Sequence, residues 1–280
     1  MIVSELIQLG STKLRGKNIK SHIIDSEILL SKALGKSREE ILIKYDKQIK
    51  FNVEKKFKSL IQRRSSNEPI AYILNYKEFW SKRFKINKST LIPRPETELL
   101  VDKLSKIYRN KNISILDIGT GSGCILISLL SELKNSSGLG IDISKKAIEV
   151  AQLNAKKFVS NKSVKFLRRS FNNIFNVKFD LIVSNPPYIK RSDIKNLNED
   201  IKRFEPKIAL DGGNDGLDVI RKVIYKTNEI LKINGKLALE IGNEQYKKVS
   251  KILKNKNFRI EYVVKDNNDN IRCLISTLLK

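Results

Sequence analysis

The feature that most constrains the fold is a regular alternation of strand-like and helix-like segments, which begins near residue 113 and continues almost to residue 280. This order predicts an α/β fold with a largely parallel sheet and helices on both faces. No helical pattern separates the last two strands, so we expect an antiparallel pair to end the sheet. The predicted strands cover 113–118, 139–143, 164–167, 179–184, 236–241, 259–264 and 272–278, and the predicted helices cover 125–133, 145–158, 219–231 and 245–254.

The chain before this alternation divides into two further parts. Residues 1–68 show helical periodicity without strand-like alternation, and predict a small helical domain. Because this part contains no nucleophile, metal cluster or phosphate loop, we expect it to dock or position a substrate. Ser21 is a candidate helix cap in this part, and Gly35 a candidate helix end. Aromatic residues and short extended runs follow in 69–93, which predict a β-hairpin connector. The third part, 94–280, then opens with a helix at Pro95.

Composition limits the class of protein. Two cysteines, Cys124 and Cys273, lie far apart and form no metal-binding pair, so we predict neither a disulfide framework nor a metal site. No secretion signal and no apolar run long enough for a membrane span is apparent, which favours a cytoplasmic protein without a membrane partner. The single histidine, His22, lies in the helical part and is expected at the surface.

The net charge of +25, from 55 basic and 30 acidic residues, would attract nucleic acid. The basic residues are scattered along the chain, however, and Lys, Asn and Ile are abundant throughout. A bias of the whole sequence toward Lys, Asn and Ile explains the net charge equally simply. The charge alone therefore assigns no function, and we expect no obligate nucleic-acid partner.

A glycine-rich loop follows the first predicted strand of the third part. It reads Gly119-Thr120-Gly121-Ser122-Gly123, and glycines there let the backbone turn tightly and approach a ligand. The spacing differs from dinucleotide-binding and phosphate-binding loops, so a ligand without phosphates fits better. Asp142 ends the next strand, where its carboxylate could accept both hydroxyls of a ribose. Together these features indicate S-adenosylmethionine, a nucleoside with an amino-acid tail.

The segment Asn185-Pro186-Pro187-Tyr188 ends the strand at 179–184. Proline cannot donate to a strand ladder, and each X-Pro bond holds the preceding residue extended, so the turn should be rigid. The Asn185 carboxamide oxygen and the Pro186 carbonyl could accept both N–H bonds of a planar amino group, while Tyr188 covers its flat face. Because these acceptors strengthen as positive charge develops on nitrogen, they suit methyl transfer to an amide or nucleobase amine without a strong base.

Longer blocks of sequence extend this pattern over most of the chain. With them, the sequence resembles the bacterial peptide chain release factor glutamine methyltransferases, the HemK-like family. This resemblance implies a helical domain, a hairpin connector and a class I S-adenosylmethionine-dependent methyltransferase domain. It also implies methylation of the glutamine in a Gly-Gly-Gln loop of class 1 release factors. The blocks that carry it are 68–74, 78–80, 91–98, 116–123, 180–188, 205–206, 209–217 and 238–242.

The resemblance also implies roles for individual residues. The cofactor would contact the glycine loop, Asp142, Asn185 and the pair Ser170 and Phe171, whereas the turn from Asn185 to Tyr188 would hold the glutamine. Arg169 departs from the family pattern, because an acidic residue usually stands there.

Three questions stay open. The substrate could instead be a glutamine of a ribosomal protein, or a nucleic-acid amine of adenine or guanine. The residue that takes the final proton is also open: Glu96 and Glu240 are chemically suitable, although either could be a structural or surface carboxylate. The sequence does not show how the helical domain docks.

Overall fold

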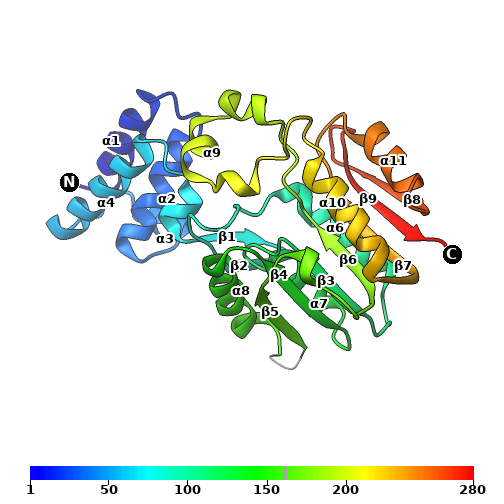
Figure 1. Cartoon of the computed structure of the whole chain (residues 1–280). Coiled ribbons are helices and arrows are strands. Elements are labelled where there is room, and N and C mark those ends of the chain that lie inside the picture. The colour runs from blue at the N-terminus through cyan, green and yellow to red at the C-terminus, as the bar shows by residue number, and fades with distance from the viewer. Residues whose placement is uncertain (161–162) are drawn as a thin grey trace. The chain divides into compact units, whose positions relative to one another are not determined.

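The computed structural model describes residues 1–160 and 163–280 (Figure 1). It divides into two compact units, each described below by itself. The first comprises residues 1–75 together with 198–204, and the second comprises 76–197 together with 205–280. The division after Asn75 falls within the segment expected to be the connector.

The first unit is a bundle of helices around one apolar core. Gly10 allows close helix packing, because a Cβ there would lie 2.4 Å from Ser26 Oγ and 2.7 Å from Phe57 Cζ. Gly35 ends one helix in the left-handed conformation, as expected, with φ of 69°. The helices that supply this core are α1 (Val3–Arg15), α2 (His22–Leu34), α3 (Arg38–Ile43), α4 (Phe51–Ser65) and α5 (Ile70–Leu74), and the unit also contains α9 (Glu199–Phe204), which has no buried residue.

One expectation for this unit needs correction. The run Ile70–Leu74 is a short helix, α5, rather than an extended segment. Its Ile73 packs fully buried in the apolar core, and this burial overrides the strand preference of its β-branched and aromatic residues. His22 is only partly exposed, and its Nδ1 lies 2.8 Å from Ser11 Oγ.

The second unit begins with the predicted hairpin, β1 (Tyr76–Phe79) and β2 (Lys82–Lys85), and contains a seven-stranded sheet in the order β5-β4-β3-β6-β7-β9-β8. The pairs among β5, β4, β3, β6 and β7 are parallel. Strand β9 is antiparallel to both of its neighbours, which confirms the expected antiparallel ending. The strands are β3 (Ser114–Ile118), β4 (Ser137–Asp142), β5 (Val164–Arg168), β6 (Phe179–Ser184), β7 (Leu231–Glu240), β8 (Phe258–Lys265) and β9 (Ile271–Leu278).

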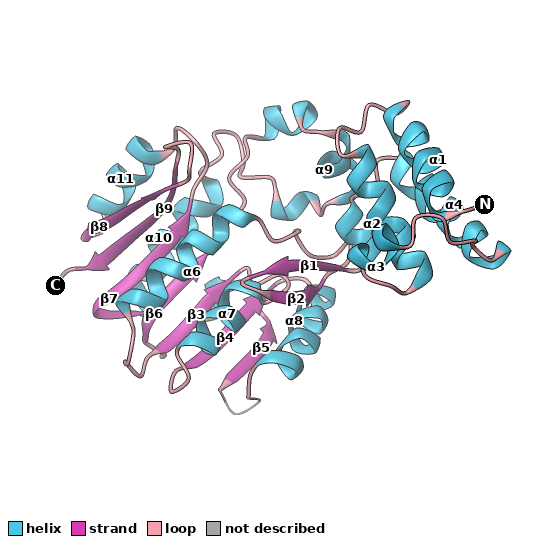
Figure 2. Cartoon of the chain, turned by 180° about the vertical axis from the view of Figure 1, so that it is seen from behind, coloured by secondary structure: helices cyan, strands magenta, loops and turns pink. Residues whose placement is uncertain are grey.

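Helices cover both faces of this sheet (Figure 2). Successive strand residues enter opposite cores: Ile115 packs with one cluster and Leu116 with the other. The central strands are therefore apolar on both faces, which explains their continuous hydrophobic runs. One face carries α6 (Pro95–Ile107), α7 (Cys124–Glu132) and α8 (Lys145–Phe158), and the other carries α10 (Asp218–Ile230) and α11 (Tyr246–Lys254).

The chain order reverses around β3. From this strand, the chain adds β4 and β5 on one side, and later β6 and β7 on the other. A crevice forms at such a point because the loops after neighbouring strands leave in opposite directions. The loops that follow β3, β4, β5 and β6 all emerge at this carboxyl edge.

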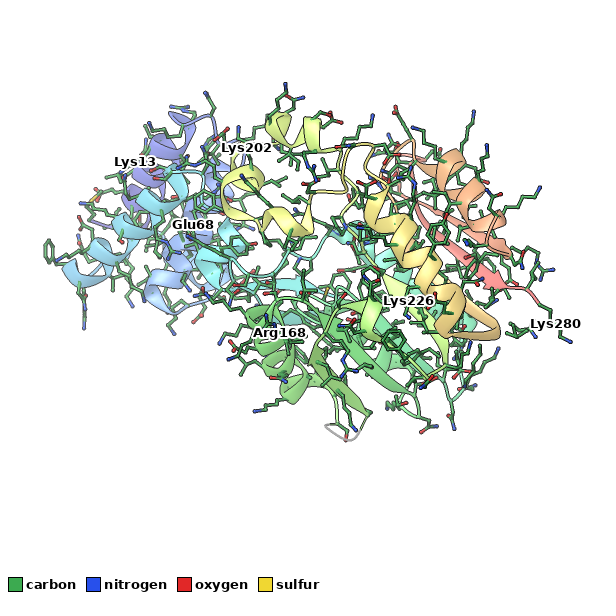
Figure 3. The ribbon with its side chains drawn as sticks, viewed as in Figure 1. Lys13, Glu68, Arg168, Lys202, Lys226 and Lys280 are labelled. Carbon is green, nitrogen blue, oxygen red and sulfur yellow. The ribbon has the colours of Figure 1, made fainter. Side chains whose placement is uncertain are left out.

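The second unit also contains short 3-10 helices. The 3-10 helices are η1 (Phe171–Asn173), η2 (Arg191–Asn196) and η3 (Lys207–Ala209). Basic side chains occur in both units, as the labelled Lys13 and Lys226 illustrate (Figure 3). Among the described residues, no helix has the length and apolar character needed to cross a membrane.

Candidate active site

A cavity of about 360 Å³ opens at the carboxyl edge of the sheet, within the size range of small-molecule sites. All of its lining residues belong to the second unit. Four stretches of the wall follow strands, and a fifth precedes and opens α6. The lining includes 118–122 after β3, 141–144 after β4, 169–172 after β5, 184–187 after β6, and Ser89, Thr90, Leu91, Pro93, Arg94 and Thr97.

The glycine loop has the backbone that close ligand approach requires. Gly119 and Gly121 have φ values of 73° and 55°, in the left-handed region that favours glycine. A Cβ at Gly119 would meet no atom within 4 Å, and one at Gly121 would meet only the Gly119 carbonyl at 3.9 Å. These two glycines therefore leave open space where other residues would place side-chain atoms. Gly123 differs: a Cβ there would lie 2.9 Å from Ile127 Cδ1, so this glycine serves helix packing.

Two carboxylates anchor this loop. The half-buried Asp142 accepts hydrogen bonds from Gly121 N at 3.0 Å and Ser144 N at 2.9 Å. Each of its oxygens keeps a further lone pair for a ligand hydroxyl, and burial raises its pKa above the ordinary value. Asp117 lies fully buried at the end of β3, and its Oδ2 accepts from the Thr120 hydroxyl at 2.7 Å. Burial raises the pKa of Asp117 to about 7.

The Asn185-Pro186-Pro187 turn forms the opposite wall. It follows β6 directly, and Ser184 at the strand end donates its hydroxyl to the Ile118 carbonyl at 2.8 Å. This bond joins the turn to the strand that precedes the glycine loop. Asn185 Nδ2 donates to Thr97 Oγ1 at 3.4 Å, and no hydrogen bond within the described chain involves Asn185 Oδ1. The turn therefore presents acceptors to the cavity that also contains the glycine loop.

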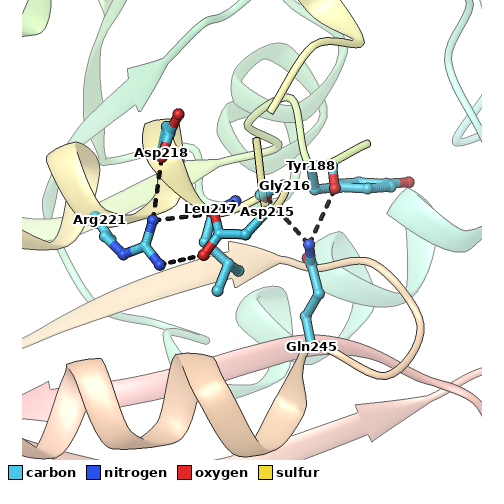
Figure 4. Close-up of polar contacts among 7 residues, drawn as sticks. All are labelled: Tyr188, Asp215, Gly216, Leu217, Asp218, Arg221 and Gln245. Atoms are coloured by element: carbon cyan, nitrogen blue, oxygen red, sulfur yellow. Dashed lines mark hydrogen bonds and ion pairs between the residues drawn. The ribbon is translucent and has the colours of Figure 1, made fainter. Parts of the chain in front are cut away.

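Tyr188 lies outside the set of described residues that line the cavity. Its ring packs against the core on the α10 face, its hydroxyl lies 3.4 Å from Glu240 Oε1, and burial raises its pKa. Gln245 donates its amide to the carbonyls of Tyr188 at 3.0 Å and Gly216 at 3.1 Å (Figure 4). A Cβ at Gly216 would lie 2.5 Å from the Tyr188 carbonyl oxygen. The aromatic ring thus supports the turn from behind.

The segment before α6 forms the rim of the cavity. Glu205 is almost fully buried, and it accepts from Arg94 Nη2 at 2.5 Å and from Ile92 N at 3.1 Å. These bonds hold the two prolines around Arg94 against Glu205, within the second unit. Thr97 follows in the first turn of α6, and it reaches both the cavity wall and Glu240.

The structure brings most of the predicted site residues to one cavity. Besides the glycines already described, Thr120, Ser122, Asp142, Ser170, Phe171, Asn185, Pro186 and Pro187 line it, whereas Gly123 and Tyr188 do not. Thr97, Glu205 and Gln245 were missed by sequence reasoning. Thr97 and Glu205 lie inside the blocks that carry the family resemblance, but nothing in the sequence indicates which side chains of a block turn inward.

The cavity fits S-adenosylmethionine better than a metal. Over residues 1–160 and 163–280, no cluster of three or more His, Cys, Asp or Glu side chains could hold an ion. The open backbone at Gly119 and Gly121 can accept an amino-acid tail, the Asp142 carboxylate can accept ribose hydroxyls, and Phe171 supplies an aromatic wall for a base. The fold and the cavity are those of the S-adenosylmethionine-dependent methyltransferases.

Comparison with known proteins identifies the family within this class. Two family models match: the PrmC N-terminal domain over residues 5–74 and the methyltransferase small domain over 95–203. The release factor glutamine methyltransferase of Haemophilus influenzae is 42% identical over 264 residues, which cover 89% of each protein. The chain belongs to the release factor glutamine methyltransferase family.

Two other similarities have a narrower meaning. The bifunctional methyltransferase of Rickettsia prowazekii is 36% identical over 94% of this chain, which spans only 55% of that relative's length. A solved structure of ribosomal protein L11 methylase from Lactobacillus delbrueckii subsp. bulgaricus has a TM-score of 0.52, with 18% identity, 74% of this chain and 91% of that chain covered. At that identity the similarity concerns the fold alone.

Proposed function

We propose that this protein transfers a methyl group from S-adenosylmethionine to the side-chain amide nitrogen of the glutamine in the Gly-Gly-Gln loop of class 1 peptide chain release factors. The main support for this proposal is that the glycine loop and the Asn185-Pro186-Pro187 turn line one cavity. The names of the relatives that match over most of both chains support the same substrate. We further propose that the reaction takes place in the cytoplasm and needs no nucleic acid.

The residues of the chain suit this reaction because it is mainly one of positioning. When bound, S-adenosylmethionine supplies an electrophilic methyl group on a sulfonium that departs as a neutral thioether. Asn185 Oδ1 and the Pro186 carbonyl accept the two N–H bonds of the glutamine amide and direct its nitrogen lone pair toward the cavity. Both bonds strengthen as the nitrogen gains positive charge, so they stabilise the transition state more than the ground state.

The substrate assignment is tested by incubating the purified protein with radiolabelled S-adenosylmethionine and a class 1 release factor. We expect label in the wild-type release factor and none in a variant whose loop glutamine is replaced by alanine. Parallel reactions contain a ribosomal protein fraction or duplex DNA. Label in either of these, with none in the release factor, would overturn the proposal in favour of that substrate.

The role of Asn185 is tested by Asn185→Ala. We expect the turnover number to fall by about 100-fold or more, because one of two transition-state acceptors is lost. Affinity for the cofactor, measured by calorimetry, should stay within about threefold, because Asp142 and the glycine loop are unchanged. Asn268→Ala, in the turn between β8 and β9, is the control. Undiminished turnover in the Asn185 variant would remove this residue from the mechanism.

A further inference from the structure

A pair of buried polar side chains lies directly behind Asn185. Thr97, from the first turn of α6, and Glu240, the last residue of β7, are each only 2% exposed. The Thr97 hydroxyl lies 2.5 Å from Glu240 Oε2, and Asn185 Nδ2 lies 3.4 Å from Thr97 Oγ1. Three residues from distant parts of the sequence thus form one chain of hydrogen bonds that ends at the cavity wall.

The chemistry of these groups fixes the direction of the hydrogen bonds. An ionised carboxylate only accepts, so Glu240 commits the hydroxyl hydrogen of Thr97 to itself. Thr97 Oγ1 can then only accept a hydrogen bond from Asn185. It therefore binds the NH2 group of the carboxamide, Nδ2, and not the carboxamide oxygen, Oδ1. The two arms of a carboxamide have nearly the same shape, so packing alone would not choose between them.

From this arrangement we propose that Thr97 and Glu240 are positioning residues, which hold the Asn185 carboxamide in the one orientation that leaves Oδ1 free to accept the amide hydrogen of the substrate. This inference rests on the proposed function, because the expected effects on kcat presuppose methyl transfer to the release factor. The opposite orientation would present NH2 to the substrate amide, and two donors would then face each other.

The surroundings of Glu240 make the arrangement sensitive to protonation. Burial raises the pKa of Glu240 to about 7, and Glu96 on α6 adds to this, whereas the Thr97 and Tyr188 hydroxyls and Arg272 on β9 oppose it. Two further ionisable neighbours are Cys124 on α7 and Cys273, which pairs with Glu240 across the sheet. A protonated Glu240 can donate to Thr97 Oγ1, which frees the Thr97 hydroxyl to donate to Asn185 Oδ1. Turnover should therefore fall as the pH drops below about 7.

The first test replaces Thr97 with valine, which has the same shape without the hydroxyl. We expect Thr97→Val to lower kcat by about 10- to 100-fold with KM for the release factor within about threefold. Thr97→Ser, which keeps the hydroxyl, should restore kcat to within about threefold of wild type. Thr227→Val is the matched control, because Thr227 is a buried threonine of α10 whose hydroxyl has no partner in the structure. Equal kcat values in the valine and serine variants would overturn the inference.

The second test reads the orientation of Asn185 without methyl transfer. In protein labelled with nitrogen-15 at asparagine, the Asn185 side-chain resonances are assigned by their loss in Asn185→Asp. One of the two amide hydrogens should exchange slowly with solvent in wild type and about tenfold or more faster in Thr97→Val. Unchanged exchange would overturn the inference even if the protein methylates release factors. A wild-type protein that shows the protection but transfers no methyl group would instead contradict the proposed function.

The third test uses Glu240→Gln and guards against a valine variant that fails to fold. The glutamine NH2 can donate to Thr97 Oγ1 at every pH, as protonated Glu240 does only below about 7. We expect a kcat reduced by about tenfold or more, without the acidic decline of the wild-type pH profile. If Glu240→Gln kept the wild-type dependence of kcat on pH, Glu240 would not set the direction of the hydrogen bond between Thr97 and Asn185.

Discussion

Asp142 illustrates how one side chain serves both the backbone and a ligand. Its two oxygens accept from Gly121 N and Ser144 N, and thereby fix the glycine loop and the start of α8 to one carboxylate. The same carboxylate lines the cavity. A ribose bound there would meet a group whose position is set before binding, so little ordering cost remains.

Replacement of Asp142 should therefore weaken cofactor binding. We expect Asp142→Ala to raise the Kd for S-adenosylmethionine by about 5- to 150-fold, equivalent to about 1–3 kcal/mol, because buried hydroxyls lose their acceptor. Asp142→Asn keeps one acceptor oxygen, so its Kd for S-adenosylmethionine should rise less than that of Asp142→Ala. Isothermal titration calorimetry gives both values, and Asp269→Ala, on the exposed turn before β9, controls for the lost charge. Unchanged affinity in the alanine variant would remove Asp142 from the ribose site.

Single residues also show where sequence reasoning reached its limit. The residues of the loop and the turn were predicted because glycine and proline have strong local consequences for the backbone. Glu240 remained ambiguous between a structural and a chemical role, because its burial depends on α6 packing beside the end of β7. Asn185 was predicted to accept a hydrogen bond, but the threonine that orients it lies 88 residues away in the sequence.

At the scale of elements, one asparagine connects the hairpin to the site. Asn154 on α8 is 2% exposed, and it donates to the Lys85 carbonyl at 2.9 Å and to the Ser122 carbonyl at 2.8 Å. Its Oδ1 also accepts from Lys85 N at 2.7 Å. The side chain thus fastens β2 and the glycine loop to the same helix.

Asn154→Ala should affect both stability and binding. It removes one buried hydrogen bond, to the Ser122 carbonyl, and two part-buried ones, to the Lys85 backbone, so we expect a loss of about 1–3 kcal/mol in the free energy of unfolding. The Kd for the cofactor should rise severalfold, because the glycine loop loses an anchor. Asn228→Ala is a matched control: its Nδ2 donates to the Lys256 carbonyl at 2.8 Å, and Asn228 does not line the cavity. If both variants bound the cofactor equally well, the hairpin would have no role in shaping the loop.

Two glycines, one in the cavity wall and one behind the Asn185-Pro186-Pro187 turn, offer a second contrast. Gly119 and Gly216 both have left-handed backbones, with φ of 73° and 77°. Only Gly216 is crowded, with the Tyr188 carbonyl oxygen 2.5 Å from the position of a Cβ. Residues 209–217 were noticed in the sequence as a block of family resemblance, and the structure gives their physical purpose, which is close approach to the back of the turn.

Alanine should therefore act differently at the two positions. We expect Gly216→Ala to lower the free energy of unfolding by about 1–3 kcal/mol more than Gly119→Ala does, because the clash adds to the shared backbone strain. Gly119→Ala should instead mainly weaken cofactor binding. Urea unfolding followed by the fluorescence of Trp80, the only tryptophan, reports on the second unit in both cases. Equal destabilisation by the two variants would show that the backbone around Tyr188 moves at little energetic cost to make room for a Cβ at residue 216.

The order and type of elements in the sheet were predictable, and most bounds agree within two residues, whereas β7 begins at Leu231, five residues before the predicted start. Periodicity and apolar runs depend on local sequence, and the predicted strand at 179–184 matches β6 at both ends. The segment between the turn and α10 was not predicted, because its 3-10 helices are short, polar and without periodicity. Residues 70–74 were assigned the wrong conformation because their packing partners lie elsewhere in the helical unit.

On the scale of the whole molecule, the charge of +25 is spread over both units. Many of the basic residues pair locally, as Lys226 does with Glu229 at 2.8 Å. This scatter agrees with a compositional bias. Inside the second unit, two buried carboxyl groups have strongly raised pKa values.

Those two groups predict how the stability of the second unit depends on pH. Burial raises the pKa values of Asp117 and Glu240 from 3.8 and 4.5 to about 7 in the folded protein. Between pH 5 and 7 the folded chain thus retains protons that the unfolded chain releases, and stability must fall as the pH rises through that interval. We expect a combined loss on the order of 5 kcal/mol between pH 5 and pH 8, about half from each group, with little further change above that.

Urea unfolding of the ligand-free protein at half-unit pH intervals, followed by Trp80 fluorescence, measures this profile for the second unit. Asp117→Asn and Glu240→Gln carry no titrating group, so each should flatten the wild-type decline by about half, and the double variant should nearly abolish it. Taking the difference between wild type and variant at each pH cancels the contribution of all other carboxylates. A wild-type protein equally stable at pH 5 and pH 8 would mean that both groups are already ionised in the folded state, and that the polar interior beneath the glycine loop and the turn is far better solvated than its burial indicates.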